Sequence, residues 1–152
     1  MQEGISLNIF GGALWTKSVL RKLNWSRGKI TPVYQDDYIK ALCGSKLALC
    51  FLSKINRDTY TRRCFEIPAT GSVLVCERTD DLTRLFKEDD EAVFFSSPQE
   101  LVKKVKALLK DESRRLKIAK AGLARVQADD HSVVGRARHV AQIIRQNLET
   151  RL

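Results

Sequence analysis

Lys46 to Cys76 reads KLALCFLSKINRDTYTRRCFEIPATGSVLVC, in which two apolar runs, residues 46–52 and 72–76, flank a polar segment. Short runs rich in branched and aromatic side chains are typical of buried strands in a parallel sheet. The polar segment has room for a loop and a short helix that breaks at Gly71. This stretch therefore predicts a strand–helix–strand unit.

Two further apolar runs extend the strand pattern. AVFF at residues 92–95 predicts a third buried strand. Residues 5–10 form a short apolar run that ends at Gly11-Gly12, which predicts another strand followed by a tight turn.

Helix signals lie between and after these runs. Ser97-Pro98-Gln99-Glu100 combines an N-cap serine, a proline in the first turn and an acid three residues after the cap. Amphipathic spacing predicts two more helices, around residues 116–126 and 133–148. Shorter helices are expected from a cap at Asp36 or Asp37 to Gly44, and after a cap at Thr79.

The alternation of strands and helices predicts an α/β fold. We expect one Rossmann-like open parallel sheet with helices on both faces, followed by two to three C-terminal helices. No Pro/Gly/Ser-rich linker interrupts the chain, so residues 1–152 are expected to form a single domain. Ligands of such sheets bind at the carboxyl ends of the strands.

Composition narrows the class of protein. The 152 residues are 43% hydrophobic, enough for a core, but no apolar run approaches the roughly 20 residues of a membrane span. The N-terminus lacks a charged segment followed by an apolar one, so a cytoplasmic location is expected.

The four cysteines form no CxxC pair, which favours buried thiols over a zinc site or a disulfide framework, and no metal is expected.

The net charge of +9 favours an anionic partner, although a solubilising surface would explain it equally well. Nucleic acid is not the favoured partner, because the sequence has no RNP-type aromatic pair, zinc knuckle or clustered basic tail. The glycine motifs of hydrolases, P-loop NTPases and classical dinucleotide-binding proteins are also absent.

The segment Asn56 to Gly71 carries the strongest functional signal. A helix beginning near residues 59–61 would direct backbone N–H groups at a ligand, and Arg57, Arg62 and Arg63 suit a diphosphate. Glu66 could accept hydrogen bonds from vicinal hydroxyl groups of a ligand. The alternative for this glutamate is an ion pair with Arg57 or Arg63.

Residues 63–71, RCFEIPATG, followed by SVLVC, resemble the R-x-F-E-x-x-A-x-G segment of group 1 glycosyltransferases of the spore maturation (CgeB-like) type. Later features are similar to the same family: the EAVFF strand, the SPQEL helix start, R-x-x-I-A-x-x-G at Arg115, Ile118, Ala119 and Gly122, and His131-Ser132 before Arg136. The resemblance covers nearly the whole chain and implies the C-terminal, nucleotide-sugar-binding half of a GT-B fold.

The resemblance also implies roles for particular residues. Glu66 matches the second acid of an E-x7-E pattern and would hold the nucleotide ribose. The first acid falls on Asp58, where the broader group has glutamate, and arginines replace the usual Gly-rich phosphate loop. The turn Gly11-Gly12 and Lys17 would contact phosphate. Tyr34 could stack on the base, but a tyrosine of the core or the rim is the favoured interpretation. The donor-binding set implied is Asn56, Arg57, Asp58, Thr61, Arg62, Arg63, Glu66, Gly11, Gly12, Lys17 and Tyr34.

The function expected from these observations is donor binding in glycosyl transfer. The substrate would be a nucleotide diphosphate sugar, with no further cofactor, and the family places the acceptor site on an N-terminal domain that this chain lacks. These residues alone would therefore bind donor but turn it over poorly, and none is a convincing nucleophile. The alternatives are a basic Rossmann-like module that binds RNA or another polyanion, and a degenerate transferase used for docking.

Overall fold

The computed structural model describes residues 4–12, 15–25 and 29–150. Its centre is a parallel sheet of β1 (Leu47–Cys50), β2 (Val73–Glu77) and β3 (Val93–Phe95), in the order β1-β2-β3. Cys50 pairs with Cys76, and Val75 pairs with Val93. The three strands confirm the strand predictions for residues 46–52, 72–76 and 92–95.

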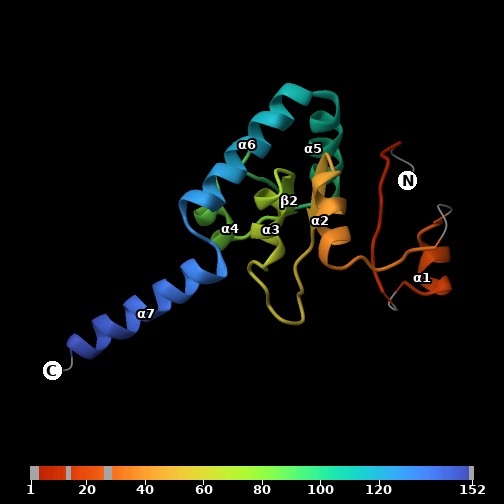
Figure 1. The fold of residues 1–152 in the computed structure, drawn as a ribbon. Coiled ribbons are helices and arrows are strands. Elements are labelled where there is room, and N and C mark those ends of the chain that lie inside the picture. The colour runs from red at the N-terminus through yellow and green to blue at the C-terminus, as the bar shows by residue number, and fades with distance from the viewer. Residues whose placement is uncertain (1–3, 13–14, 26–28, 151–152) are drawn as a thin grey trace.

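Helices surround the sheet and continue beyond it (Figure 1). Between the strands lie α3 and α4, while α5 and α6 follow β3 and pack against the sheet. The fold is therefore α/β with an open parallel sheet, as predicted. The helix bounds are α1 (Lys17–Lys22), α2 (Gln35–Cys43), α3 (Arg63–Ala69), α4 (Asp80–Leu85), α5 (Pro98–Lys110), α6 (Glu112–Ala128) and α7 (Val133–Glu149).

Both faces of the sheet are covered. Along β2, Leu74 and Cys76 point into a cluster with residues of α3 and α4, whereas Val73 and Val75 point into a cluster with α5. Helix α6 contributes to both clusters. A central strand buried on both sides explains the continuous apolar run SVLVC.

Most helix starts follow the capping signals in the sequence. The Thr79 hydroxyl accepts a hydrogen bond from the Leu82 N–H at 3.1 Å, and the Ser97 hydroxyl accepts one from the Glu100 N–H at 3.2 Å. Glu100 in turn accepts a bond from the Ser96 N–H at 2.8 Å, one residue earlier than a standard capping box.

Two predicted helix starts are displaced. Tyr34 occupies the N-cap position of α2, so Asp36 and Asp37 lie in its first turn and not at its cap. There the carboxylates still face the positive end of the helix. Helix α3 begins at Arg63, later than the predicted 59–61, and Gly71 follows its end with a φ of +76°, a conformation that favours glycine.

The strand predicted at residues 5–10 was wrong. The sheet of the described chain contains only β1, β2 and β3. Along residues 5–10 half-buried positions alternate with exposed ones, and Phe10 is 49% exposed. Ile5 packs on the edge of the α5 cluster, so the apolar residues of this segment cover the domain from outside instead of pairing with β1.

The R-x-x-I-A-x-x-G pattern marks the buried face of α6. Arg115, Ile118, Ala119 and Gly122 lie one turn apart on that face and are all buried. The Arg115 guanidinium donates to the carbonyl oxygen of Leu108 at 3.2 Å, which ties α6 to the end of α5. The pattern in this chain therefore has a packing role.

Helix α7 extends away from the rest of the molecule and ends near the C-terminus (Figure 1). None of its side chains between Val133 and Glu149 is buried. No helix in the described part of the chain has both the length and the apolar character that a membrane span requires.

Replacing Gly122 tests the close approach of α6 to the sheet. A Cβ atom at this position would lie 2.5 Å from the carbonyl oxygen of Glu91. We expect Gly122→Ala to lower the free energy of unfolding by about 1–3 kcal/mol, despite the higher helix propensity of alanine. Urea titrations would measure the change.

The matched control is Gly12→Ala, where an added Cβ would meet nothing within 4 Å. This variant should stay within about 0.5 kcal/mol of the wild type. An equal loss in both variants would contradict the packing role assigned to Gly122.

Candidate functional site

A cavity of about 630 Å³ lies where the loop after β1 enters α3, beside the start of α2. Segments that are far apart in the sequence meet there. The cavity is lined by Phe10, Gly11, Gly12, Pro32, Val33, Tyr34, Gln35, Tyr38, Thr61, Arg62, Arg63 and Glu66.

Glu66 is the acidic residue of this cavity, and both of its carboxylate oxygens have partners. The Tyr38 hydroxyl donates to Oε2 at 3.0 Å, and Arg62 Nε lies 2.7 Å from Oε1. Its side chain is 29% exposed, whereas that of Arg62 is 88% exposed. The ion pair therefore involves Arg62, and not Arg57 or Arg63 as the sequence suggested.

The positions of these groups follow from the packing of α3. Cys64, Ile67 and Pro68 are buried against the sheet and α6, which turns Arg63 and Glu66 toward the cavity. Arg62 and Glu66 are four residues apart, the spacing at which helical side chains meet.

Helix α2 brings Tyr38 to the same place. The Ser72 hydroxyl, just before β2, donates to the carbonyl oxygen of Leu42 at 2.5 Å and lies 3.2 Å from that of Ser45. These contacts hold the end of α2 against the sheet. Tyr38 lies one turn before Leu42, and its hydroxyl therefore reaches Glu66 across the cavity.

The sequence analysis missed Tyr38. Burial and the hydrogen bond to Glu66 raise its pKa to about 12. A usable signal existed, because Tyr34 and Tyr38 are spaced by one helical turn at the start of a predicted helix. The partner, however, is 28 residues away in the chain and could not be identified from spacing.

The turn Gly11-Gly12 reaches the cavity through a bond between distant backbone groups. The Gly11 N–H donates to the carbonyl oxygen of Thr31 at 3.1 Å. A Cβ on Gly11 would lie 2.1 Å from Trp15 Nε1, so the indole ring occupies the space of a side chain. Tyr34 also lines the cavity but is 72% exposed, which places it at the rim.

Four of the residues singled out in the sequence do not line the cavity: Asn56, Arg57, Asp58 and Lys17. The first three form a tight turn. Asp58 Oδ2 accepts a hydrogen bond from the Ser53 N–H at 3.4 Å, and the Asn56 N–H donates to the Ser53 hydroxyl at 3.3 Å. Lys17 begins α1 and is exposed.

Three of the backbone donors at the start of α3 are already used. The N–H of Cys64 donates to the carbonyl oxygen of Thr61. The N–H groups of Phe65 and Glu66 donate to the carbonyl oxygen of Arg62, and all three distances are 2.9–3.1 Å. The turn formed by Thr61 and Arg62 satisfies them because Arg62 has helical backbone angles. Positive charge for an anion in this cavity therefore comes from Arg62 and Arg63.

The shifted pKa of Tyr38 gives a test of its bond to Glu66. Because the folded pKa of about 12 lies above the usual tyrosine pKa of about 10, the folded state holds this proton more tightly than the unfolded state. The resulting stability is present below pH 10 and lost as the pH rises toward 12. Tyr38→Phe should remove this loss, measured by urea unfolding across that range.

Tyr60→Phe is the matched control, since Tyr60 lies outside the cavity and its ring packs edge-on against Phe65. It should leave the pH dependence of the wild type in place. Equal pH profiles for the wild type and Tyr38→Phe would contradict the bond.

Comparison with known proteins shows to which family the chain is similar. The model of the family described as "Glycosyl transferase-like" matches residues 1–142, which include every residue lining the cavity. A comparison with curated proteins finds no match. Because the match spans most of the chain, this protein belongs to the glycosyl transferase-like family.

Proposed function

We propose that the cavity binds the nucleoside diphosphate portion of a sugar donor, and that this chain is the C-terminal donor half of a GT-B transferase of the group 1, CgeB-like type. The observation that carries the proposal is the Glu66 carboxylate, oriented by Tyr38 in a cavity that also contains Arg62 and Arg63. Family membership supports glycosyl transfer as the reaction.

The carboxylate suits the ribose. Glu66 Oε2 accepts the hydrogen bond from Tyr38, Oε1 forms the ion pair with Arg62, and both oxygens keep further acceptor capacity. Vicinal ribose hydroxyls can donate to that capacity without breaking the bond from Tyr38. Since Tyr38 stays protonated below about pH 12, it holds the carboxylate in one orientation before the ligand arrives.

The arginines suit the diphosphate. Arg62 Nε forms the ion pair with Glu66, and the guanidinium carries further N–H groups that can bind phosphate oxygens. Arg63 supplies a second guanidinium on the same wall. During transfer these charges would offset the negative charge that develops on the departing diphosphate.

Other residues that line the cavity would contact the base or the phosphates of the donor. Tyr34, exposed at the rim, is placed for stacking on the base. At Gly12, where an added side chain would meet no other atom, the backbone is open to close approach by the ligand. The acceptor site would lie on an N-terminal domain, so we propose that these 152 residues bind donor without efficient turnover.

Calorimetric titration with UDP, GDP, ADP and dTDP tests the proposal. One nucleoside diphosphate should bind the wild type, and Glu66→Gln should weaken it about tenfold, because a charged hydrogen bond contributes roughly 1.5–3 kcal/mol. Arg63→Ala should weaken the affinity for the nucleoside diphosphate at least as much as Glu66→Gln does. Glu66→Gln itself should leave the contacts to the diphosphate intact.

Arg57→Ala is the matched control, since Arg57 lies outside the cavity and should leave the affinity unchanged. Equal losses for Arg57→Ala and Arg63→Ala would contradict the cavity as the site. Binding of a short RNA with a steep salt dependence, and of no nucleoside diphosphate, would favour a polyanion-binding module instead.

A further inference from the structure

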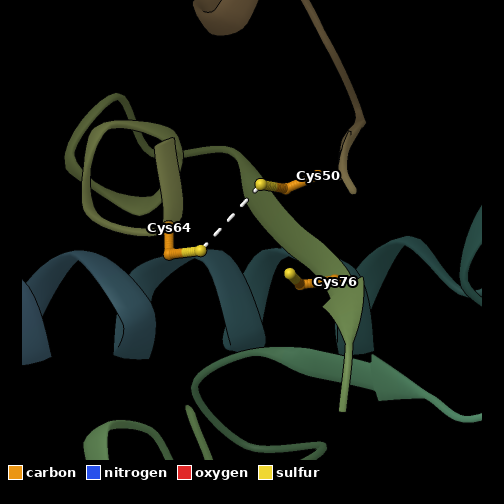
Figure 2. Close-up of side chains that lie close together, drawn as sticks. All are labelled: Cys50, Cys64 and Cys76. Atoms are coloured by element: carbon orange, nitrogen blue, oxygen red, sulfur yellow. Dashed lines mark hydrogen bonds between the residues drawn. The ribbon is translucent and has the colours of Figure 1, made fainter. Parts of the chain in front are cut away.

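Three of the four cysteines meet in the core. Cys50 ends β1, Cys64 lies in the first turn of α3 and Cys76 lies in β2, and each has no exposed surface. Figure 2 shows the three side chains converging from these different elements. All three sulfur atoms lie within 4.8 Å of one another, and the Sγ atoms of Cys50 and Cys64 are 3.9 Å apart. Cys43 is exposed and stands apart.

The separation between the Sγ atoms of Cys50 and Cys64 suits two ligands of one metal ion. With metal–sulfur bonds of about 2.3 Å, tetrahedral geometry places two sulfur ligands roughly 3.8 Å apart. Trigonal geometry at the same bond length gives about 4.0 Å. The Cys50–Cys64 separation falls between these values, so both sulfurs could bind one ion without movement of the backbone.

A fourth polar atom lies beside the sulfurs. Thr61 Oγ1 is 3.7 Å from Cys50 Sγ and 3.9 Å from Cys64 Sγ. Thr61 also lines the cavity. The cysteine cluster therefore lies directly behind the wall that carries Arg62 and Arg63.

The three thiols of the cluster differ in the direction in which their pKa values are shifted. Hydrogen bonds from Cys50 and then Cys76 lower the pKa of Cys64, and the pKa values of Cys50 and Cys76 are raised, mainly by their hydrogen bonds within the cluster. A metal ion displaces the thiol protons as it binds, and its positive charge offsets part of the negative charge of the three thiolates.

We propose that Cys50, Cys64 and Cys76 form a buried binding site for a thiophilic d10 metal ion, either Zn²⁺ or Cu⁺. Thiolate sulfur is the ligand that selects such ions, and a set of three suits trigonal Cu⁺ directly. Zn²⁺ would take the Thr61 hydroxyl or a water molecule as its fourth ligand. The ion would join β1, α3 and β2 at the point where α3 begins, and would thereby hold the arginine wall of the cavity in place.

The experiment uses the whole chain, reduced and freed of metal, titrated separately with Zn²⁺ and with Cu⁺ against a competing chelator. We expect one equivalent of one of these ions to bind and the Tm to rise. X-ray absorption on the wild-type complex should count three sulfur ligands at about 2.3 Å. An additional oxygen ligand would identify the tetrahedral arrangement, and its absence the trigonal one.

Single variants then assign the ligands. Cys50→Ser, Cys64→Ser and Cys76→Ser should each weaken binding by more than the roughly 100-fold that loss of an outer-shell partner costs. Cys43→Ser is the matched control and should bind like the wild type. Where a core variant fails to fold, the sulfur count on the wild-type protein still decides the question.

Two results would overturn the proposal. One is the absence of one-to-one binding for both ions under reducing conditions. The other is a bound ion with fewer than three sulfur ligands, or one that is lost in Cys43→Ser. Neither of these two results depends on donor binding, because nucleoside diphosphates are left out of the titration. The proposed function and the metal site are therefore tested separately.

Discussion

The packing of α3 against the sheet is the constraint on which the rest of the structure depends. Cys64, Ile67 and Pro68 are buried, and Pro68 faces α6 at the point where Gly122 leaves room for it. A side chain at Gly122 would push α6 away from both the loop before β3 and this helix. The short helix is held by these contacts, since seven residues have little helical stability of their own.

The orientation of α3 gives its two faces different chemistry. The inner face places a thiol among the core residues, while the outer face presents Arg63 and Glu66 to the cavity. Tyr38 then connects α2 to α3 through Glu66, and this hydrogen bond spans the cavity wall. A substitution that tilts α3 would therefore disturb the carboxylate, the arginines and the cysteine cluster together.

The loop after β1 is held in place by hydrogen bonds within the loop, which its polar composition does not reveal. Its polar and charged residues are the kind that bind ligands, yet the Asp58 carboxylate and the backbone N–H of Asn56 close a turn on Ser53. Closing that turn returns the chain toward the sheet at Thr61, which contacts two of the cysteine sulfurs. Part of the apparent functional signal in the segment is thus structural.

The sequence by itself determined the α/β class, the three strands and the starts of the helices at Asp80, Pro98 and Val133. These features depend on local patterns: apolar runs of strand length, capping residues such as Thr79 and Ser97, and amphipathic spacing. The misplaced strand at residues 5–10 shows the limit of that reasoning, because an apolar run does not specify whether a neighbouring strand is available for pairing.

Only the tertiary structure decided which residues meet. Glu66 finds Tyr38 from α2, and Cys50, Cys64 and Cys76 converge although the chain contains no CxxC pair. Arg57 and Arg63 look equivalent in the sequence, yet only Arg63 lines the cavity. The physical reason is that contacts between distant segments depend on how whole elements pack, and the spacing of residues along the chain does not encode that packing.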